Sequence, residues 1–175
     1  VPRLLEVFDR YDLSVTFHVP GKVVEDWPET IQMIHDHGHE LAHHGYTHVA
    51  PNEMSRDEEE AEFKKAMDTF DDVVGETPVG YRNPGGGMSD HTIEFIQEEG
   101  MIYDSSRKDT DIPYMRYDSD IVEVPNSYLL DDFVYWGFNM SPPFAFQSGI
   151  APNGPVFDTW EDEFEATHKR NRMFM

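Results

Sequence analysis

The stretch His35-Asp-His-Gly-His-Glu-Leu-Ala-His-His-Gly-Tyr-Thr-His48 holds six of the nine histidines of this 175-residue chain. It contains two overlapping spacings that are typical of metal ligands. In HELAH, His39 and His43 flank Glu40 as in the HExxH pattern, and in HGYTH, His44 and His48 form an HxxxH pair. Only one of the two spacings can be the metal site, and the secondary structure expected for each indicates which one it is.

The HELAH spacing needs a helix, because only a helix brings positions i and i+4 together on one face. Here the helical pattern of residues 27–37 stops at Gly38, and the five residues that follow predict a short strand. On a strand, His39 and His43 share a face but stand ~13 Å apart. That separation is too large for one zinc ion with Zn–N bonds of ~2 Å, so HELAH is predicted to be coincidental.

The HGYTH spacing lies just past this predicted strand. Gly45 gives the backbone freedom to turn, so His44 and His48 can approach each other. A bare HxxxH pair is also typical of surface loops, and this alternative stays open on the spacing alone.

Strands and helices alternate along the rest of the chain, which predicts an α/β fold with a parallel sheet and helices outside. The sheet is either open or closed as a β/α barrel, and in both cases function lies at the carboxyl ends of the strands. We expect one domain over residues 1–175, and a fragment cut from a longer protein at both ends, because a helix starts at once and residues 173–175 begin a strand. The predicted strands are 14–19, 39–43, 79–81, 101–104 and 121–124, the predicted helices are 2–11, 27–37, 56–74, 90–99 and 159–168, and the predicted long loops are 105–120 and 126–157.

The composition excludes several classes of function. With 35 acidic residues against 13 basic ones, the surface repels nucleic acids and anionic membranes. The chain has no cysteine, so any metal must be held by imidazole or carboxylate. The acidic, lysine-poor surface favours a protein from concentrated salt. No transmembrane or signal-peptide pattern occurs, so we expect a cytoplasmic location, and homo-oligomerisation stays open.

A second constellation, Tyr81-Arg82-Asn83-Pro84-Gly85-Gly86, follows the next predicted strand. An arginine before a rigid Pro-Gly turn is suited to holding a carboxylate or an anionic intermediate. Because consecutive parallel strands end at the same edge, this turn and HGYTH are expected to lie side by side.

These blocks resemble the polysaccharide deacetylase (NodB-homology, carbohydrate esterase family four) superfamily. The resemblance is nearest to its peptidoglycan deacetylase subgroup, whose relatives also act on cyclic imides or ureides. It covers nearly the whole chain and is carried by residues 16–21, 38–41, 43–48, 80–86, 103–106, 122–125 and 130–133.

The resemblance implies an incomplete, irregular β/α barrel that here lacks its first strand and its last strand or strands. It implies one divalent metal, usually zinc, with His44 and His48 as ligands and an aspartate ligand outside the chain. It gives Arg82 the role of orienting the base and Gly85 that of a backbone oxyanion donor, while the base aspartate and the acid histidine also fall outside the chain. Asn83, Pro84 and Asp132 are the expected substrate contacts; Asn83 and Gly85 depart from the Arg-Pro-Pro-Tyr-Gly pattern of many members.

The function predicted in this way is metal-dependent hydrolysis of an amide bond in an N-acetylated sugar or peptidoglycan-type substrate, with this fragment itself inactive. Three alternatives remain at this stage: a cyclic imide or ureide hydrolase of the allantoinase kind, a non-catalytic carbohydrate-binding relative, and an acidic scaffold without a site.

Overall fold

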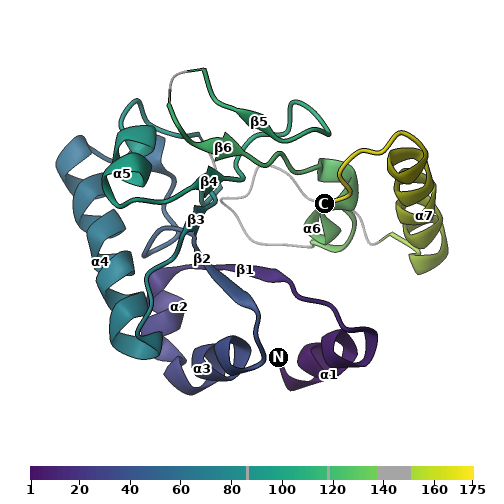
Figure 1. Ribbon diagram of the computed structural model, residues 1–175, viewed down its shortest axis with the longest axis horizontal. Coiled ribbons are helices and arrows are strands. Elements are labelled where there is room, and N and C mark those ends of the chain that lie inside the picture. Colours follow the sequence, from purple (N-terminus) through teal and green to yellow (C-terminus); the bar gives the residue numbers. More distant parts are fainter. Residues whose placement is uncertain (86, 118, 138–150) are drawn as a thin grey trace. The chain divides into compact units, whose positions relative to one another are not determined.

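The computed structural model describes residues 1–85, 87–117, 119–137 and 151–175 (Figure 1). The chain divides into two compact units. Unit 1 comprises residues 1–106 and 115–123, and unit 2 comprises residues 107–114 and 124–175. The expectation of a single domain over the whole chain stays a prediction.

Unit 1 is built on a parallel sheet, as the alternation of elements predicts. β1 (Thr16–Val19) pairs with β2 (Glu40–His43), and the sheet continues through β3 (Gly80–Tyr81), β4 (Tyr103–Asp104) and β6 (Val122–Glu123). The strand order is β1-β2-β3-β4-β6-β5, in which β5 is Tyr114–Met115. The carboxyl ends of five strands therefore meet at one edge.

Helices cover one side of this sheet (Figure 1). Two apolar clusters pack the helices against the sheet, one around Phe70 at the first two strands and one around Phe63 and Tyr81 at the later strands. The side chains of the opposite face are therefore left for other contacts. The helices of unit 1 are α1 (Pro2–Tyr11), α2 (Gly21–Asp26), α3 (Pro28–Asp36), α4 (Arg56–Val74) and α5 (Thr92–Glu98), with a short 3-10 turn at Pro51–Glu53.

Helix α4 shows how the sequence sets these elements. Ser55 and Glu58 form the capping box that the sequence predicts, and the helix ends at Gly75, which adopts φ 77°. The buried carboxylate of Glu59 accepts hydrogen bonds from the hydroxyl groups of Ser89 and Thr92. These hydrogen bonds link the start of α5 to α4.

Helix α2 is absent from the predicted elements, because Pro20-Gly21 has the composition of a turn. In the structure Pro20 is the N-cap of this helix and Gly21 is its first residue. A Cβ atom on Gly21 would lie 2.9 Å from the Cα of Ala66 in α4, so the glycine permits close packing of the two helices. The predicted start of α5, at residue 90, is two residues early: Ser89 accepts hydrogen bonds from the N–H groups of His91 and Thr92, and the helix begins at Thr92.

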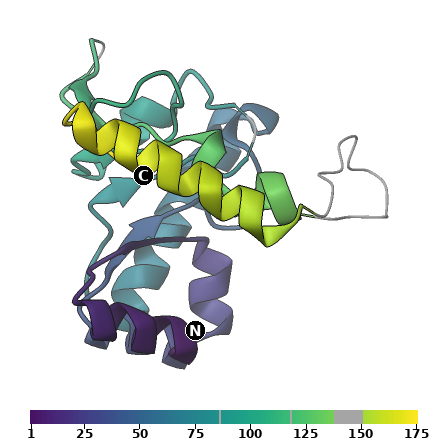
Figure 2. The ribbon, with the colours of Figure 1, turned by 90° about the vertical axis from the view of Figure 1, so that its right-hand side faces the viewer.

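Unit 2 contains a 3-10 turn (Tyr128–Leu130), α6 (Asp132–Trp136) and α7 (Asn153–Lys169), the last drawn in yellow in Figure 2. The helix predicted from residue 159 is too short, because Pro155 has the composition of a loop although the first turn of a helix tolerates proline. The strand expected from residue 173 is not formed. The predicted loop at 126–157 holds α6 and the start of α7, and its residues 138–150 lie outside the described residues. Trp136 packs against Phe157 and Trp160, so these partly exposed aromatic rings pack on one another within unit 2.

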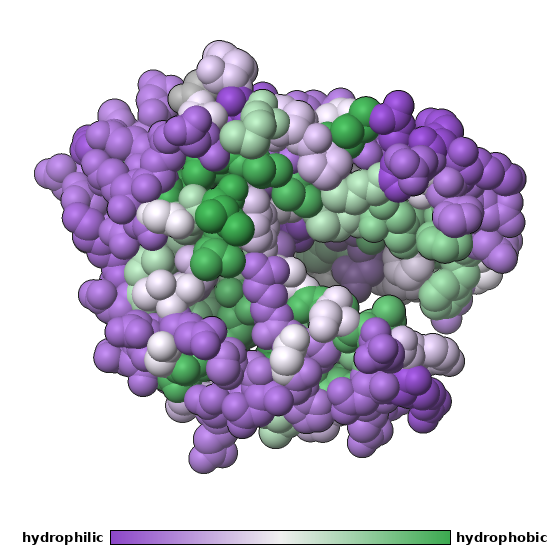
Figure 3. All heavy atoms as spheres, in the orientation of Figure 1, coloured by the Kyte–Doolittle hydropathy of each residue, from purple (hydrophilic) through white to green (hydrophobic). Residues whose placement is uncertain are grey.

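Hydrophilic residues dominate the visible surface around α4 and α5 (Figure 3), as expected from the net charge of −22. Among the described residues, none of the helices combines the length and apolarity needed to span a bilayer.

Candidate functional site

The two histidines of HELAH do not meet. His43 is fully buried on the helix-covered face, where its ring stacks on Phe63 with centroids 4.2 Å apart and its Nε2 lies 3.2 Å from the Phe63 carbonyl oxygen. His39 lies in the other cluster, with its ring 5.4 Å from that of Phe8 and 5.7 Å from that of Phe17. Glu40 to His43 form a strand, so the prediction that HELAH is coincidental is confirmed.

The register of the sheet brings the two predicted constellations together at its carboxyl edge. His43 is paired with Tyr81, and Tyr81 with Asp104, so the next residues of the three strands form a second row. This row is His44, Arg82 and Ser105. Because side chains alternate along a strand, the row faces away from the helices that bury His43 and Tyr81.

His44 and His48 lie close to each other, with ring centroids 4.8 Å apart and an interplanar angle of 70°. Gly45 adopts φ 69° and His48 φ 66°, so the chain uses left-handed backbone twice to bring the second ring back to the first. A Cβ atom on Gly45 would lie 3.0 Å from Cγ of Pro84, which shows how closely the HGYTH loop packs on the Arg82 turn.

The Nδ1 atom of His44 lies 2.8 Å from the carbonyl oxygen of Arg82. This contact fixes the orientation of the imidazole and leaves its Nε2 as the nitrogen for a ligand. Burial, opposed by this hydrogen bond, lowers the pKa of His44 to about 4, so the ring is neutral at pH 7. Neutral imidazole is the form that binds metal ions.

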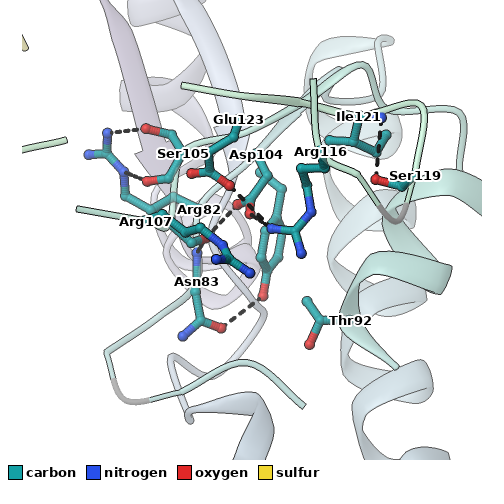
Figure 4. A network of polar contacts seen from close by, with 12 residues as sticks. Arg82, Asn83, Thr92, Asp104, Ser105, Arg107, Arg116, Ser119, Ile121 and Glu123 are labelled. Atoms are coloured by element: carbon teal, nitrogen blue, oxygen red, sulfur yellow. Dashed lines mark hydrogen bonds and ion pairs between the residues drawn. The ribbon is translucent and has the colours of Figure 1, made fainter. Parts of the chain in front are cut away.

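The side chain of Arg82 is held by the neighbouring strand (Figure 4). Its Nε donates to the Ser105 carbonyl oxygen at 3.0 Å, and Nη2 donates to Ser105 Oγ at 2.7 Å. The Arg82 N–H donates to the His43 carbonyl oxygen, which ties the turn to β2. The predicted role of Arg82, orienting a base, stays a prediction; the contacts with Ser105 help to position its guanidinium group.

The turn after Arg82 is held by its own polar groups. The Asn83 N–H donates to Ser106 Oγ at 2.9 Å, and the Asn83 side-chain amide donates to the Gly85 carbonyl oxygen at 2.7 Å. Gly85 is exposed with φ 54°, and Pro84 is buried against Gly45. These contacts give the amide of Asn83 a role in the shape of the turn, while the substrate contacts predicted for Asn83 and Pro84 and the oxyanion role of Gly85 stay predictions.

Asp132 belongs to unit 2, where it is the exposed first residue of α6. Its predicted contact with substrate stays a prediction.

The two imidazoles fit half of a zinc site. Two histidines that bind one tetrahedral zinc ion through bonds of ~2 Å have ring centroids about 5 Å apart, and the 4.8 Å spacing of His44 and His48 agrees with this. Within residues 1–85, 87–117, 119–137 and 151–175, no cluster of three or more histidine, cysteine, aspartate or glutamate side chains is close enough to hold a metal ion. A further ligand would therefore come from other residues.

Two features of this region were not predicted from the sequence. His18 in β1 lies beside His44, with ring centroids 6.4 Å apart, and burial together with the charge of Arg82 lowers its pKa to about 3. Its place in the apolar–polar alternation of residues 14–19 was the available signal.

The second missed feature is a buried ionic group on the helix-covered face, seen in Figure 4. Arg116 Nη1 lies 3.7 Å from Asp104 Oδ2 and 3.3 Å from Glu123 Oε2, and both carboxylates are fully buried. Burial and then the neighbouring Glu123 raise the pKa of Asp104 to about 7. Charged residues inside otherwise apolar strands were the signal for this group.

Comparison with known proteins places the chain in a family. The family model described as polysaccharide deacetylase matches residues 1–103. A peptidoglycan deacetylase from Helicobacter pylori is 29% identical over 97% of this chain and 66% of its own length. A peptidoglycan deacetylase-like protein from Gibberella zeae is 24% identical over 94% of this chain and 56% of its own length.

Solved structures support the fold. A Mycobacterium smegmatis protein assigned as a polysaccharide deacetylase is 35% identical, with a TM-score of 0.86 over 96% of this chain and 59% of that one. The Puue allantoinase, at 21% identity and a TM-score of 0.80, covers 98% of this chain and 56% of its own, and shows the fold alone. The chain thus spans less than two thirds of the proteins it matches. These likenesses confirm the prediction of an α/β fold of the incomplete, NodB-like β/α barrel type, and the chain belongs to the polysaccharide deacetylase family.

Proposed function

We propose that the protein is a metal-dependent hydrolase of C–N bonds that removes the acetyl group from an N-acetylated sugar, most simply a peptidoglycan-type oligosaccharide. The observation that carries the proposal is the His44–His48 pair beside the Arg82 turn, with the His44 ring fixed by the Arg82 carbonyl oxygen. The peptidoglycan deacetylase from H. pylori supports the choice of substrate.

In this proposal His44 and His48 hold one zinc ion, together with a ligand from outside the described residues. When bound, the zinc ion polarises the amide carbonyl group and lowers the pKa of a bound water. The neutral state of His44, which burial maintains, leaves its Nε2 lone pair available without the loss of a proton.

The Arg82 turn supplies the remaining chemistry of this chain. The guanidinium group, held by two hydrogen bonds to Ser105, orients the carboxylate that acts as base. The backbone N–H of Gly85, an exposed residue, donates to the oxygen on which negative charge develops. This proposal takes the base and the acid histidine from residues beyond those described, and the fragment alone is expected to be inactive.

The proposed partners follow from the site and the charge. They are a small-molecule or oligosaccharide substrate and, at a net charge of −22, neither nucleic acid nor an anionic membrane. Assembly into homo-oligomers, and the cytoplasmic location proposed from the composition, remain to be measured.

The experiment is a substrate survey with the protein at its natural full length, loaded with zinc. We expect release of acetate from N-acetylglucosamine oligomers or peptidoglycan fragments. Turnover of succinimide or hydantoin with no acetate release would replace the proposal by a cyclic imide or ureide hydrolase. Binding of oligosaccharide without any turnover would favour a carbohydrate-binding relative.

A further inference from the structure

Asp104 is a buried carboxyl group that the proposed mechanism does not use. It is the last residue of β4 and has no exposed surface. Its Oδ2 lies 3.7 Å from Nη1 of Arg116, and its Oδ1 accepts a hydrogen bond from the hydroxyl group of Ser106. Apolar side chains of similar size often replace a buried ionic group without loss of stability, so stability alone does not explain a carboxyl group at this position.

The hydroxyl group of Ser106 connects Asp104 with the turn that follows Arg82. Ser106 Oγ donates to Asp104 and accepts from the backbone N–H of Asn83 at 2.9 Å. In Figure 4, Asp104 accordingly lies between the side chain of Arg116 and Asn83. A hydroxyl group can rotate, and an acceptor for its proton fixes the direction of its lone pairs. Asp104 therefore orients the oxygen atom that holds the Asn83 backbone.

Asn83 links the two ends of this turn. Its side-chain amide donates to the Gly85 carbonyl oxygen at 2.7 Å, and its Oδ1 accepts from the hydroxyl group of Tyr81 at 3.4 Å. Gly85 adopts φ 54°, so the turn has a left-handed conformation that these contacts maintain. A shift of the Asn83 backbone would therefore displace the guanidinium group of Arg82 on one side and the N–H group of Gly85 on the other.

Asp104 is too deeply buried to act on a substrate itself. Its side chain lies on the face of the sheet that buries His43 and Tyr81, whereas Arg82 belongs to the opposite face. A side chain in this position influences a reaction only through its neighbours. The contact with Ser106 provides that route, and all of its members belong to unit 1.

We propose that Asp104 is a positioning residue, which acts through the Ser106 hydroxyl group to fix the turn that presents Arg82 and Gly85. The inference rests on the proposed function, since it assigns Asp104 to the same reaction. It distinguishes two replacements of Asp104: asparagine keeps an oxygen atom that accepts from Ser106, and leucine, of similar size, does not.

The test uses the full-length protein loaded with zinc and N-acetylglucosamine oligomers as substrate. We expect Ser106→Ala to lower kcat about 10-fold, the equivalent of one hydrogen bond, with KM and zinc affinity within about twofold of wild type. Ser106→Thr keeps the hydroxyl group and should restore most of the activity. The matched control is Ser119→Ala, which should keep the wild-type kcat, because the Ser119 hydroxyl group accepts from the N–H of Ile121, outside the Arg82 turn.

Asp104 itself is tested by the two replacements. Asp104→Asn should keep kcat within about threefold of wild type, and Asp104→Leu should lower it about as much as Ser106→Ala does. Combining Asp104→Leu with Ser106→Ala should cause no further loss, because both changes remove the same contact. If Asp104→Leu does not fold, it is made together with Arg116→Met and Glu123→Leu, since replacing a whole buried ionic group is tolerated better than breaking it.

A readout independent of activity is the hydrogen-exchange rate of the Asn83 N–H group, followed by NMR. Exchange should be faster in Ser106→Ala and in the Asp104→Leu proteins, and close to wild type in Asp104→Asn and Ser119→Ala. A side chain that only stabilised the fold would change exchange across the core of unit 1 and not selectively in this turn.

Three results would overturn the proposal. Full kcat in Ser106→Ala would show that the hydroxyl group does not position the turn. Additive losses in the double variant would show that Asp104 acts by another route. Faster exchange throughout unit 1, with a lower melting temperature and unchanged kcat, would leave Asp104 a role in stability alone. Wild-type protein that releases no acetate would refute the proposed function, while the exchange rate of Asn83 would still show whether Asp104 fixes the turn.

Discussion

The carbonyl oxygen of Arg82 lies 2.8 Å from Nδ1 of His44, so the backbone of one strand end sets the orientation of a ring on its neighbour. The same residue contributes its guanidinium group to the turn that follows. A single strand end therefore supports both the proposed metal ligand and the proposed anion-binding group.

Replacing His44 by alanine should reduce zinc affinity by at least ~100-fold, because a ligand is lost and the loss of a group that merely supports a ligand already costs ~10–100-fold. His48→Ala should have a similar effect. Isothermal titration with zinc measures both. The matched control is His91→Ala, which replaces a partly exposed histidine at the N-cap of α5 and should bind zinc like wild type. Equal affinities in all four proteins would remove His44 and His48 from the metal site.

Arg82→Lys should lower kcat about 10²-fold, since a lysine cannot form the two contacts with Ser105 and the group it orients would be displaced. Zinc affinity should be nearly unchanged, because the Arg82 carbonyl oxygen that holds His44 belongs to the backbone. Steady-state acetate release together with zinc titration separates these effects. A variant with full activity would show that the guanidinium group has no part in the reaction.

The buried carboxyl group of Asp104 predicts a pH dependence of stability. Its pKa is about 7 in the folded protein and 3.8 when the carboxyl group is fully solvated, so the folded state holds the proton more tightly than the unfolded chain. This stabilisation is complete below pH 4 and is lost as the pH rises towards 7.

Relative to Asp104→Asn, wild-type protein should therefore lose free energy of unfolding between pH 4.5 and 7.5. Urea denaturation of both proteins at several pH values measures the difference. A difference that grows in favour of wild type with rising pH would mean that the Arg116 ion pair outweighs burial.

Gly21→Ala should destabilise the protein by about 1–3 kcal/mol, the usual cost of forcing an extra carbon into a packed interface. The new Cβ would lie 2.9 Å from the Cα of Ala66 and 2.7 Å from the ring of Tyr46, and the Ala66 backbone cannot rotate away. Gly154→Ala is the matched control, since nothing lies within 4 Å of its Cβ position in α7. Its effect should stay within about 1 kcal/mol, and equal effects at both sites would contradict the close packing of α2 on α4.

The net charge of −22 predicts that salt stabilises the fold. Raising KCl from 0.1 M to 1 M shortens the screening length from ~10 Å to ~3 Å and so weakens the repulsion among the carboxylates. The melting temperature should rise over this range, as circular dichroism can record. A non-ionic osmolyte at equal osmolality serves as the control, and a flat or falling curve in KCl would argue against adaptation to salt.

The sequence predicted those parts of the fold that local patterns determine. Gly38 and Gly45 delimit β2 closely enough to separate HELAH from HGYTH, and the capping box of Ser55 and Glu58 marks the start of α4. The first helix after β1 was missed because its boundary depends on contact with α4 and not on propensity. The start of α7 was missed because a proline in a first turn has the composition of a loop.

The site was predictable to the same extent. HGYTH and the Arg82 turn could be placed at one edge because parallel strands end together. The role of Ser105 and the contact between the rings of His18 and His44 depend on the register between strands that are far apart in the chain, which no local pattern encodes. The ionic group of Arg116 depends on the same register.

His43 and His44 are adjacent in the chain, yet one ring packs against Phe63 and the other meets His48. Their surroundings differ only because successive side chains of a strand point to opposite faces of the sheet. Deleting one residue between Gly38 and His43 would leave the five residues of HGYTH unchanged. It would shift the alternation of side chains in β2, so that His43 and His44 would compete for the buried position. Proteins that share the motif can thus differ in metal binding through a change in strand length alone.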